Sequence, residues 1–346
     1  MMRLWRCLTA LVLALLLTLS VGAAGTAGFS DVPESHWAAQ SIRRCAQYNL
    51  LQGVGGGRFG LGRTMTRAAY ATALCRLMGW ELATPEKGSF TDNQDTAKWY
   101  YSAIETAYAH GALTGESRQC RPNDAITREE MAKMTVRALG LAVLSGAAAD
   151  DCPFSDVSVA QGYVALAYRM GIIKGVSAYN FEPKKEATRE QAAAVLLRTY
   201  DRLHAAIKVT EAADGSAPSG CVTAGSITEE SGSVPVSPRA PMEEVYAAAV
   251  RAGEGGSVAL RAVPLLQVTR AGAVTDTREL TEGELIELLS EGTLRTHRPA
   301  QHGSSCGYRT EKDGSVTVVW YESETDIAEK TELCRLLGIG NVYVLK

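Results

Sequence analysis

The sequence predicts a mostly α-helical protein in which three helix–loop–helix repeats are followed by a small α+β unit. A Thr-Arg pair recurs at a constant spacing of 61 residues, at Thr66-Arg67, Thr127-Arg128 and Thr188-Arg189. A Phe-x-Asp segment precedes each pair, at Phe29-Ser-Asp31, Phe90-Thr-Asp92 and Phe154-Ser-Asp156. A repeat of this kind is usually one supersecondary unit that cannot bury its apolar face alone. The three repeats are therefore expected to share one core and to present equivalent sites around it.

Residues 1–27 are predicted to be a signal peptide. Arg3 and Arg6 precede an apolar run from Leu8 to Leu19, and small residues follow up to Ala27. A charged segment, an apolar segment and a small-residue cleavage zone in this order are typical of exported proteins. A membrane anchor is the other interpretation, but the run is shorter than the ~20 residues that span a bilayer. We therefore expect a secreted protein with no stable membrane span after cleavage.

Each repeat is expected to contain two helices joined by a glycine-containing loop. In repeat 1 (29–80), apolar residues recur at helical spacing over 37–46, a Gly-rich loop follows, and Thr66 opens a helix that ends at Gly79. The matching helices are predicted near 100–110 and 128–139 in repeat 2 (90–141), and near 163–170 and 189–204 in repeat 3 (152–203). Gly111 and Gly171 stand where repeat 1 has Asn49, which also tolerates a left-handed backbone.

After the repeats, residues 209–241 are rich in Gly, Ser, Pro and Ala, which predicts a flexible linker. Residues 242–346 are expected to form the α+β unit, with helices over 242–251, 281–289 and 325–337 and strands over 257–262, 265–270, 316–321 and 341–345. The last strand, helix and strand favour a βαβ unit in which 316–321 and 341–345 pair in parallel. Glu322 and Glu324 are interpreted as solvated loop charges rather than as a catalytic pair.

Composition and charge argue against several classes of protein. The chain has 346 residues, of which 46% are hydrophobic and 21% charged, and a net charge of −3. Its Lys and Arg form no basic stripe, so nucleic acid is not an expected partner. Seven of the eight Cys lie beyond residue 27, an odd number without a C-x-x-C pair, which predicts neither a disulfide framework nor a zinc site. Cys45 and Cys75 are expected to be small core residues, and no metal or cofactor is predicted.

The Thr-Arg motif has two interpretations. Thr at the N-cap, with Glu130 or Gln191 three residues later, forms a capping box worth about 1 kcal/mol. Capping does not explain an Arg at the first helical position, because a cation is unfavourable beside the positive end of a helix dipole. An anion held by the Arg and the free backbone N–H groups would explain it. Arg67, Arg128 and Arg189 are therefore candidate ligand-binding residues, and a purely structural role is the alternative.

Trp37 and Trp99 follow the Phe-x-Asp segment in repeats 1 and 2 and also have two interpretations. Each ring could pack in the core against the second helix, or could offer a stacking face for a sugar. The Gly-rich loop is not a phosphate-binding P-loop, because no Gly-Lys-Ser/Thr follows it. The loop glycines Gly53, Gly115 and Gly175 are expected to permit close backbone approach or a tight turn, and they complete the candidate ligand-binding set.

A pattern of Phe-x-Asp-Val, Trp-Ala, a loop glycine and Thr-Arg-x-Glu, which recurs with variations in three copies over residues 29–203, strongly resembles S-layer homology (SLH) domains. The resemblance implies a three-lobed, pseudo-threefold spindle around a central bundle. It also implies non-covalent binding of secondary cell-wall polysaccharide, acidic or pyruvylated, in grooves between adjacent repeats, and hence a place at the cell wall or cell surface. In that family the motif Arg and a nearby Trp contact the acidic sugar, which corresponds here to Arg67, Arg128, Arg189, Trp37 and Trp99.

Two departures from the SLH pattern bear on the candidate site. Ala69 replaces the family's Glu in repeat 1, and Val159 stands where repeat 3 should have its Trp. At most two grooves are therefore expected to be fully equipped. Arg128 is expected to contribute more to binding than Arg189, because repeat 2 keeps its own Trp99.

The C-terminal unit has a faint resemblance to the last βα unit of family-18 chitinase-like glycosidases, over residues 313–343. The Asp-x-x-Asp-x-Glu motif that supplies the acid in that family is missing from the sequence, and the unit is far shorter than the ~250 residues of a full barrel. The sequence therefore predicts a protein that is not an enzyme and is anchored by its repeats. The alternative is a surface glycan-active enzyme or carbohydrate-binding module whose C-terminal domain is a degenerate glycosidase.

Overall fold

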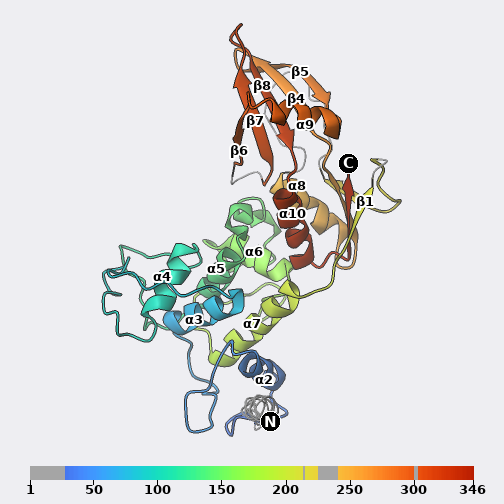
Figure 1. The fold of residues 1–346 in the computed structure, drawn as a ribbon. Coiled ribbons are helices and arrows are strands. Elements are labelled where there is room, and N and C mark those ends of the chain that lie inside the picture. The colour runs from blue at the N-terminus through green and yellow to red at the C-terminus, as the bar shows by residue number, and fades with distance from the viewer. Residues whose placement is uncertain (1–27, 213–214, 225–240, 300–302) are drawn as a thin grey trace, which may run out of the picture.

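The computed structural model describes residues 28–212, 215–224, 241–299 and 303–346, so the predicted signal peptide lies outside the described residues. Three helical repeats form the lower part of the molecule, and a C-terminal unit with two sheets lies above them (Figure 1). Within the described part of the chain, no helix is long and apolar enough to cross a membrane.

Each repeat contains the two helices that its apolar spacing predicts. The first helices are α2 (Ala39–Gln47), α4 (Tyr101–Ala109) and α6 (Gln161–Arg169), and the second are α3 (Arg67–Met78), α5 (Arg128–Ala138) and α7 (Arg189–Leu203). The Thr66 and Thr127 side chains accept the backbone N–H three residues later, as predicted for N-caps. Asn49, Gly111 and Gly171 follow the first helices with φ of 56°, 70° and 69°, which confirms their predicted equivalence.

A closed cycle of three backbone hydrogen bonds joins the repeats, and it is made by the residue before each motif Thr. Met65 N–H donates to Ala187 O, Ala187 N–H to Ile126 O, and Ile126 N–H to Met65 O, each at 2.8 Å. All three residues are fully buried. The first helix of each repeat packs on the second helix of the preceding one: α4 on α3, α6 on α5, and α2 on α7. Buried backbone groups need partners, so each repeat depends on both others.

The Asp of each Phe-x-Asp segment shapes the loop of its own repeat. Asp31 accepts the backbone N–H groups of the Phe59–Leu61 turn at 2.7–3.0 Å, and Asp92 and Asp156 accept the corresponding groups in repeats 2 and 3. Although partial burial opposes it, these donors hold the pKa of each carboxyl group below its ordinary value. The motif Asp is therefore a loop anchor.

The Phe of each segment lies against the loop glycine of the same repeat. A Cβ added to Gly53, Gly115 or Gly175 would come within 2.7, 2.5 or 2.4 Å of the ring of Phe29, Phe90 or Phe154. No real Cβ atom fits at such distances. The close backbone approach expected at these glycines is therefore present, and its partner is the Phe ring of the repeat.

The C-terminal unit contains a parallel and an antiparallel sheet. The parallel sheet has the order β1-β9-β3-β2, with bounds Lys208–Ala212, Asn341–Leu345, Ser257–Arg261 and Val222–Ala224. The antiparallel sheet has the order β5-β4-β8-β7-β6, with bounds Ala273–Glu279, Leu265–Arg270, Val316–Tyr321, Ser305–Thr310 and Arg295–His297. The helices are α8 (Met242–Ala252), α9 (Glu282–Ser290) and α10 (Glu324–Leu336).

This unit differs from the sequence prediction in three respects. The segment predicted as a linker contains β1 and β2, which pair with β9 and β3, while 225–240 lie outside the described residues. The predicted βαβ pairing is wrong, because β8 and β9 belong to different sheets. Strands β5, β6 and β7 were not predicted. β5 and β6 are almost entirely exposed and therefore lack the apolar alternation that marks a half-buried strand.

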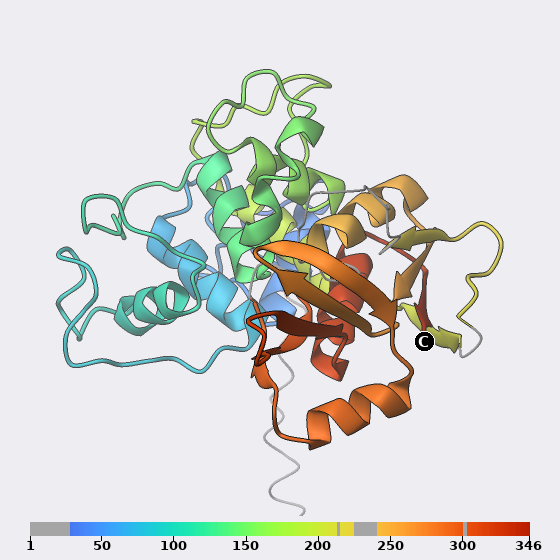
Figure 2. The ribbon, with the colours of Figure 1, turned by 90° about the horizontal axis from the view of Figure 1, so that it is seen from above.

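Packing joins the C-terminal unit to the repeats. The 3-10 helices η1 (Leu141–Ser145) and η2 (Ala149–Asp151) connect repeats 2 and 3, and α8 packs against η1 while α10 packs against α7. Tyr246 Oη donates to Asp151 at 2.6 Å, and Arg202 pairs with Glu254 at 2.8 Å. One hydrophobic cluster runs from the repeats into α8, α10 and the parallel sheet. Seen from above, α3 and α4 lie on one side of the molecule and the parallel sheet lies on the other (Figure 2).

We predict that Gly115→Ala destabilises the protein by roughly 1–3 kcal/mol, because the added methyl group overpacks the loop against Phe90. Gly146→Ala is the matched control: its φ is −66° and nothing lies within 4 Å of the added Cβ. Chemical denaturation of both variants measures the difference. Equal stability of the two variants would show that the loop glycines are not required for Phe packing.

Candidate ligand-binding groove

Each motif Arg reaches from the start of its helix to the loop of the next repeat. The Nε atoms of Arg67, Arg128 and Arg189 donate to Cys120 O, Phe181 O and Phe59 O at 2.9, 2.7 and 3.0 Å. The Nη2 atoms donate to Thr114 O, Lys174 O and Gln52 O. These carbonyl groups supply the negative partner that the position needs. Each motif Arg therefore has a structural role. It connects two repeats and takes no part in the helix cap.

Burial of these guanidinium groups is consistent with this bridging role. Arg67 and Arg128 are only 5% and 8% exposed. Burial lowers the pKa of all three Arg side chains, which stay charged because the ordinary pKa of Arg is far above neutrality. Replacing a motif Arg would break contacts between repeats as well as remove a charge.

A groove of about 290 Å³ lies where the three repeats meet. Trp37 of repeat 1, Arg128 of repeat 2 and Gly175 of repeat 3 all line it, together with Met131, Ile173, Lys174, Val176, Phe181, Gln191, Ala194, Val195 and Arg198. Three of these side chains are cationic, and no Asp or Glu is among the described residues that line the groove. The Trp37 side chain is 61% exposed. The groove thus combines positive charge with an accessible aromatic face.

The structure places the two Trp differently from the sequence expectation. Core packing is wrong for both, because Trp37 and Trp99 are 61% and 67% exposed. The Trp that accompanies Arg128 in the groove is Trp37, whereas Trp99 lies edge-on to Tyr100 at 5.3 Å. The reason is the packing of each first helix on the preceding repeat, which brings α2 beside α7. A Trp and an Arg from the same repeat therefore do not share this groove.

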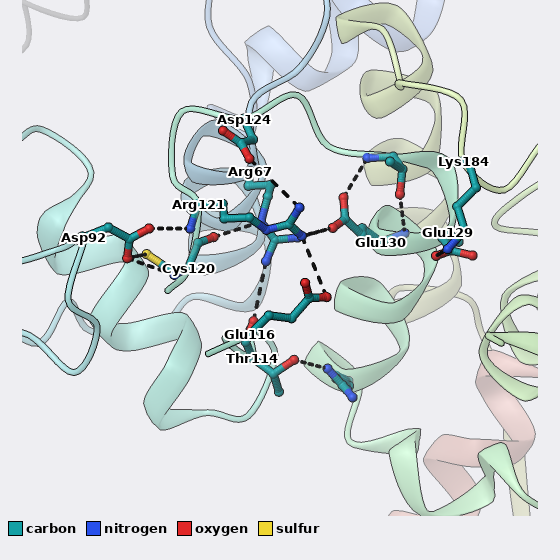
Figure 3. A network of polar contacts seen from close by, with 12 residues as sticks. Arg67, Asp92, Thr114, Glu116, Cys120, Arg121, Asp124, Glu129, Glu130 and Lys184 are labelled. Atoms are coloured by element: carbon teal, nitrogen blue, oxygen red, sulfur yellow. Dashed lines mark hydrogen bonds and ion pairs between the residues drawn. The ribbon is translucent and has the colours of Figure 1, made fainter. Parts of the chain in front are cut away.

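The remaining predicted site residues, Arg67, Arg189, Gly53, Gly115 and Trp99, do not line this groove. Arg189 lies over the Phe59 ring at 4.9 Å, as Arg128 lies over Phe181 at 4.5 Å. Arg67 instead forms an ion pair with Glu130, with 2.9 Å between Nη1 and Oε1. Figure 3 shows Arg67 and Arg121 converging on this carboxylate.

Arg198 was not predicted, although a signal for it exists in the sequence. An Arg stands nine residues after each motif Arg, at Arg76, Arg137 and Arg198. Nine residues correspond to two and a half helical turns, so the two Arg of one helix point to opposite sides of it. The groove instead combines the motif Arg128 of repeat 2 with Arg198 of repeat 3. Arg198 Nη1 donates to Ile172 O at 3.2 Å.

Comparison with known families agrees with this architecture. The model of the S-layer homology domain matches residues 28–71, 89–132 and 153–193. The chain carries three SLH domains. Each matched segment contains one Phe-x-Asp segment and one Thr-Arg pair. The predicted recognition is thereby confirmed.

Similar proteins share the SLH region. An amylopullulanase of Thermoanaerobacterium thermosulfurigenes is 34% identical over 179 residues, covering 49% of this chain and 9% of that protein. An S-layer protein of Bacillus thuringiensis subsp. finitimus is 29% identical over 56% of this chain and 24% of its own length. The S-layer protein sap of Bacillus anthracis is 30% identical over 52% of this chain and 22% of its own length. This chain therefore spans less than a quarter of these relatives.

Among solved structures, the putative sporulation-specific glycosylase ydhD from Bacillus subtilis is 14% identical and covers 36% of this chain and 43% of that chain, with a TM-score of 0.29. The spore cortex-lytic enzyme SleL of Bacillus cereus is 12% identical. The match covers 37% of this chain and 31% of that chain, with a TM-score of 0.30. These scores are too low to carry an argument about fold or activity.

In the C-terminal unit, the prediction that Glu322 is a solvated loop charge is wrong. Its side chain is 4% exposed and forms an ion pair with Lys330, whose side chain is 1% exposed. Ser304 Oγ donates to Glu322 at 2.7 Å and accepts from Lys330 Nζ at 2.8 Å. Burial raises the pKa of Glu322 and lowers that of Lys330, and the ion pair opposes both shifts. Glu324 is exposed at the start of α10, as expected. The two acids therefore do not converge as a catalytic pair.

We predict that Lys330→Met lowers the free energy of unfolding by about 3–5 kcal/mol, because it leaves Glu322 buried without a counter-ion. Lys346→Met, which breaks the exposed pair with Glu211 at 3.0 Å, should cost less than about 1 kcal/mol. The double variant Lys330→Met/Glu322→Leu should recover most of the loss. Urea denaturation measures the free energy of unfolding of all three variants. If Lys330→Met lowered it no more than Lys346→Met does, the Lys330–Glu322 pair would not be a buried ion pair.

Proposed function

We propose that the SLH domains anchor this protein non-covalently to the bacterial cell wall by binding acidic secondary cell-wall polysaccharide. The observation that carries the proposal is the groove at Trp37, Arg128 and Arg198, where the described lining residues include three cationic side chains, an exposed aromatic ring and no acid. The S-layer proteins among the relatives share this region, which supports a place at the cell surface. The predicted signal peptide supports export.

Each part of the groove has a defined role in this proposal. A sugar ring would lie on the face of Trp37, since aromatic rings offer apolar surface to such rings. The acidic substituent, a carboxylate or a pyruvate ketal, would accept charge-assisted hydrogen bonds from Arg198, Lys174 and the Nη1 donors of Arg128. Gly175 lets the repeat 3 loop pack closely enough to form one wall. The two carbonyl bonds of Arg128 orient its guanidinium before the ligand arrives.

The cyclic contacts between repeats support the pseudo-threefold spindle that the SLH resemblance implies. Under that arrangement, Trp99, Arg189 and Gly53 would form a second groove. Arg67 and Gly115 would belong to a third, in which Val159 replaces the Trp. The polysaccharide ligand and these residue roles are proposed for this chain on the strength of the one groove described above.

Catalysis is not part of the proposed function. The amylopullulanase shares only the SLH region with this chain. In the C-terminal unit, the strand-end acid Glu322 is held in a buried ion pair. We therefore propose that residues 242–346, together with the strands β1 and β2 that complete their parallel sheet, form a unit without glycosidase activity that the SLH domains hold at the wall.

We predict that Trp37→Ala and Arg198→Gln each weaken binding to isolated cell walls by about tenfold to a hundredfold. Burying an aromatic face is worth about 1.5–3 kcal/mol, as is a charge-assisted hydrogen bond. Both side chains are better targets than Arg128, because Trp37 is exposed and Arg198 donates a single hydrogen bond, to Ile172 O, within the described part of the chain. Co-sedimentation with walls, before and after extraction of secondary polymer, measures the effect.

The matched control is Arg270→Gln, which removes an exposed Arg from the far antiparallel sheet. It should bind like the wild-type protein, and all variants should melt at similar temperatures. Undiminished wall binding by both groove variants, or binding that survives removal of the secondary polymer, would overturn the proposal.

A further inference from the structure

One side of the candidate groove is formed by the 170–174 segment, which follows α6. Two residues of the segment, Ile173 and Lys174, line the groove. Three of its backbone carbonyl groups, at alternate positions, each accept a hydrogen bond from an Arg side chain. The donor and acceptor atoms are Arg202 Nε with Met170 O at 2.7 Å, Arg198 Nη1 with Ile172 O at 3.2 Å, and Arg128 Nη2 with Lys174 O at 2.9 Å.

The Arg at the start of this segment is particular to repeat 3. In the corresponding segments of repeats 1 and 2, 48–52 and 110–114, the described carbonyl groups that accept from an Arg belong to the last residue alone. The counterparts of Arg202 are Trp80 and Leu141, which lie beyond the ends of α3 and α5. Helix α7 is longer and still contains its Arg. Repeat 3 therefore has an additional fixed point beside the groove.

The C-terminal unit holds the Arg202 side chain in place. The end of α7 lies beside α10 (Figure 1). Arg202 Nη2 pairs with Glu254, which follows α8, at 2.8 Å. A Cβ added to Gly338, which follows α10, would come within 2.5 Å of Arg202 Nη1. Gly255 N–H donates to Gly338 O at 2.7 Å and so joins the two helix ends. The guanidinium group is thus fixed from the side of the C-terminal unit.

We propose that Arg202 is a positioning residue for the groove, and that the C-terminal unit promotes polysaccharide binding through it without touching the ligand. The inference rests on the proposed function and adds to it a residue and a unit that orient the site. Moving the guanidinium group would release Met170 O and let the 170–174 segment shift, together with Lys174. A groove that must be ordered when the ligand arrives binds more weakly than one that is already formed.

The decisive variant is Gly338→Ala in the full chain, because it displaces Arg202 without changing any charge. Gly314→Ala is the matched control: both glycines have φ of 81°, but nothing lies within 4 Å of a Cβ at Gly314. Both variants should lose stability from the strained backbone. Gly338→Ala alone should weaken binding, by about twofold to thirtyfold. The probe is soluble acidic polysaccharide released from bacterial walls, and titration calorimetry well below the melting temperature measures its affinity.

Arg202→Gln is the second variant, and Arg169→Gln is its control. Arg169 lies one residue before the segment and pairs with Asp151 at 3.7 Å, so its loss removes the same charge from the same repeat. Arg202→Gln should weaken binding as Gly338→Ala does, and Arg169→Gln should bind like the wild-type protein. In the free protein, Arg202→Gln should also speed amide hydrogen exchange at Ile172 and Ile173 while the central amides of the repeats stay protected. A general loss of stability would speed exchange everywhere.

The outcomes separate the inference from the proposed function. Wild-type affinity in either Gly338→Ala or Arg202→Gln, alongside lost binding in Trp37→Ala, would overturn the inference and leave the proposed function standing. Equal weakening by Gly338→Ala and Gly314→Ala would also overturn it, because lost stability would then explain the effect. If the wild-type protein did not bind the acidic polymer, the proposed function and the inference would both be overturned.

Discussion

The architecture of the SLH region depends on the cycle of backbone hydrogen bonds from Met65 to Ala187, Ala187 to Ile126 and Ile126 to Met65. A buried hydrogen bond contributes only about 0.5–1.5 kcal/mol, but a buried group left without a partner costs about 1–3 kcal/mol. Removing one repeat would leave one donor and one acceptor of this cycle without partners. The cycle therefore couples the repeats, and it fixes the starting points of all three second helices next to one another at the centre.

The position of the candidate groove follows from that coupling. Because α3, α5 and α7 begin at the centre, each motif Arg lies within reach of the loop of the next repeat, whose carbonyl groups the Asp and Gly residues have already oriented. Each first helix packs on the preceding second helix, which carries Trp37 to the side of α7. The groove consequently takes its aromatic ring, its buried cation and its loop wall from three different repeats. A single repeat would contain no complete groove.

The sequence predicted most of the local structure correctly. Apolar spacing and capping residues gave every helix of the repeats, because these signals act within one or two turns of chain. It could not show the bridging role of Arg67, Arg128 and Arg189, because the carbonyl groups they contact lie about 50 or more residues away along the chain. The sequence also cannot show that Trp37 and not Trp99 shares a groove with Arg128, because that neighbourhood depends on the packing of α2 on α7. Strands β5 and β6 carry little apolar pattern, and the partners of β1 and β2 lie beyond any local window.

Native-state amide hydrogen exchange tests the central hydrogen-bond cycle most directly. The backbone N–H groups of Met65, Ile126 and Ala187 belong to three different repeats, yet the cycle predicts that they open together. Their opening free energies should be equal, should match the global free energy of unfolding, and should fall by the same amount when any one repeat is destabilised. Fast exchange at one of the three amides while the other two stay protected would show that the repeats are independent units and would contradict the account.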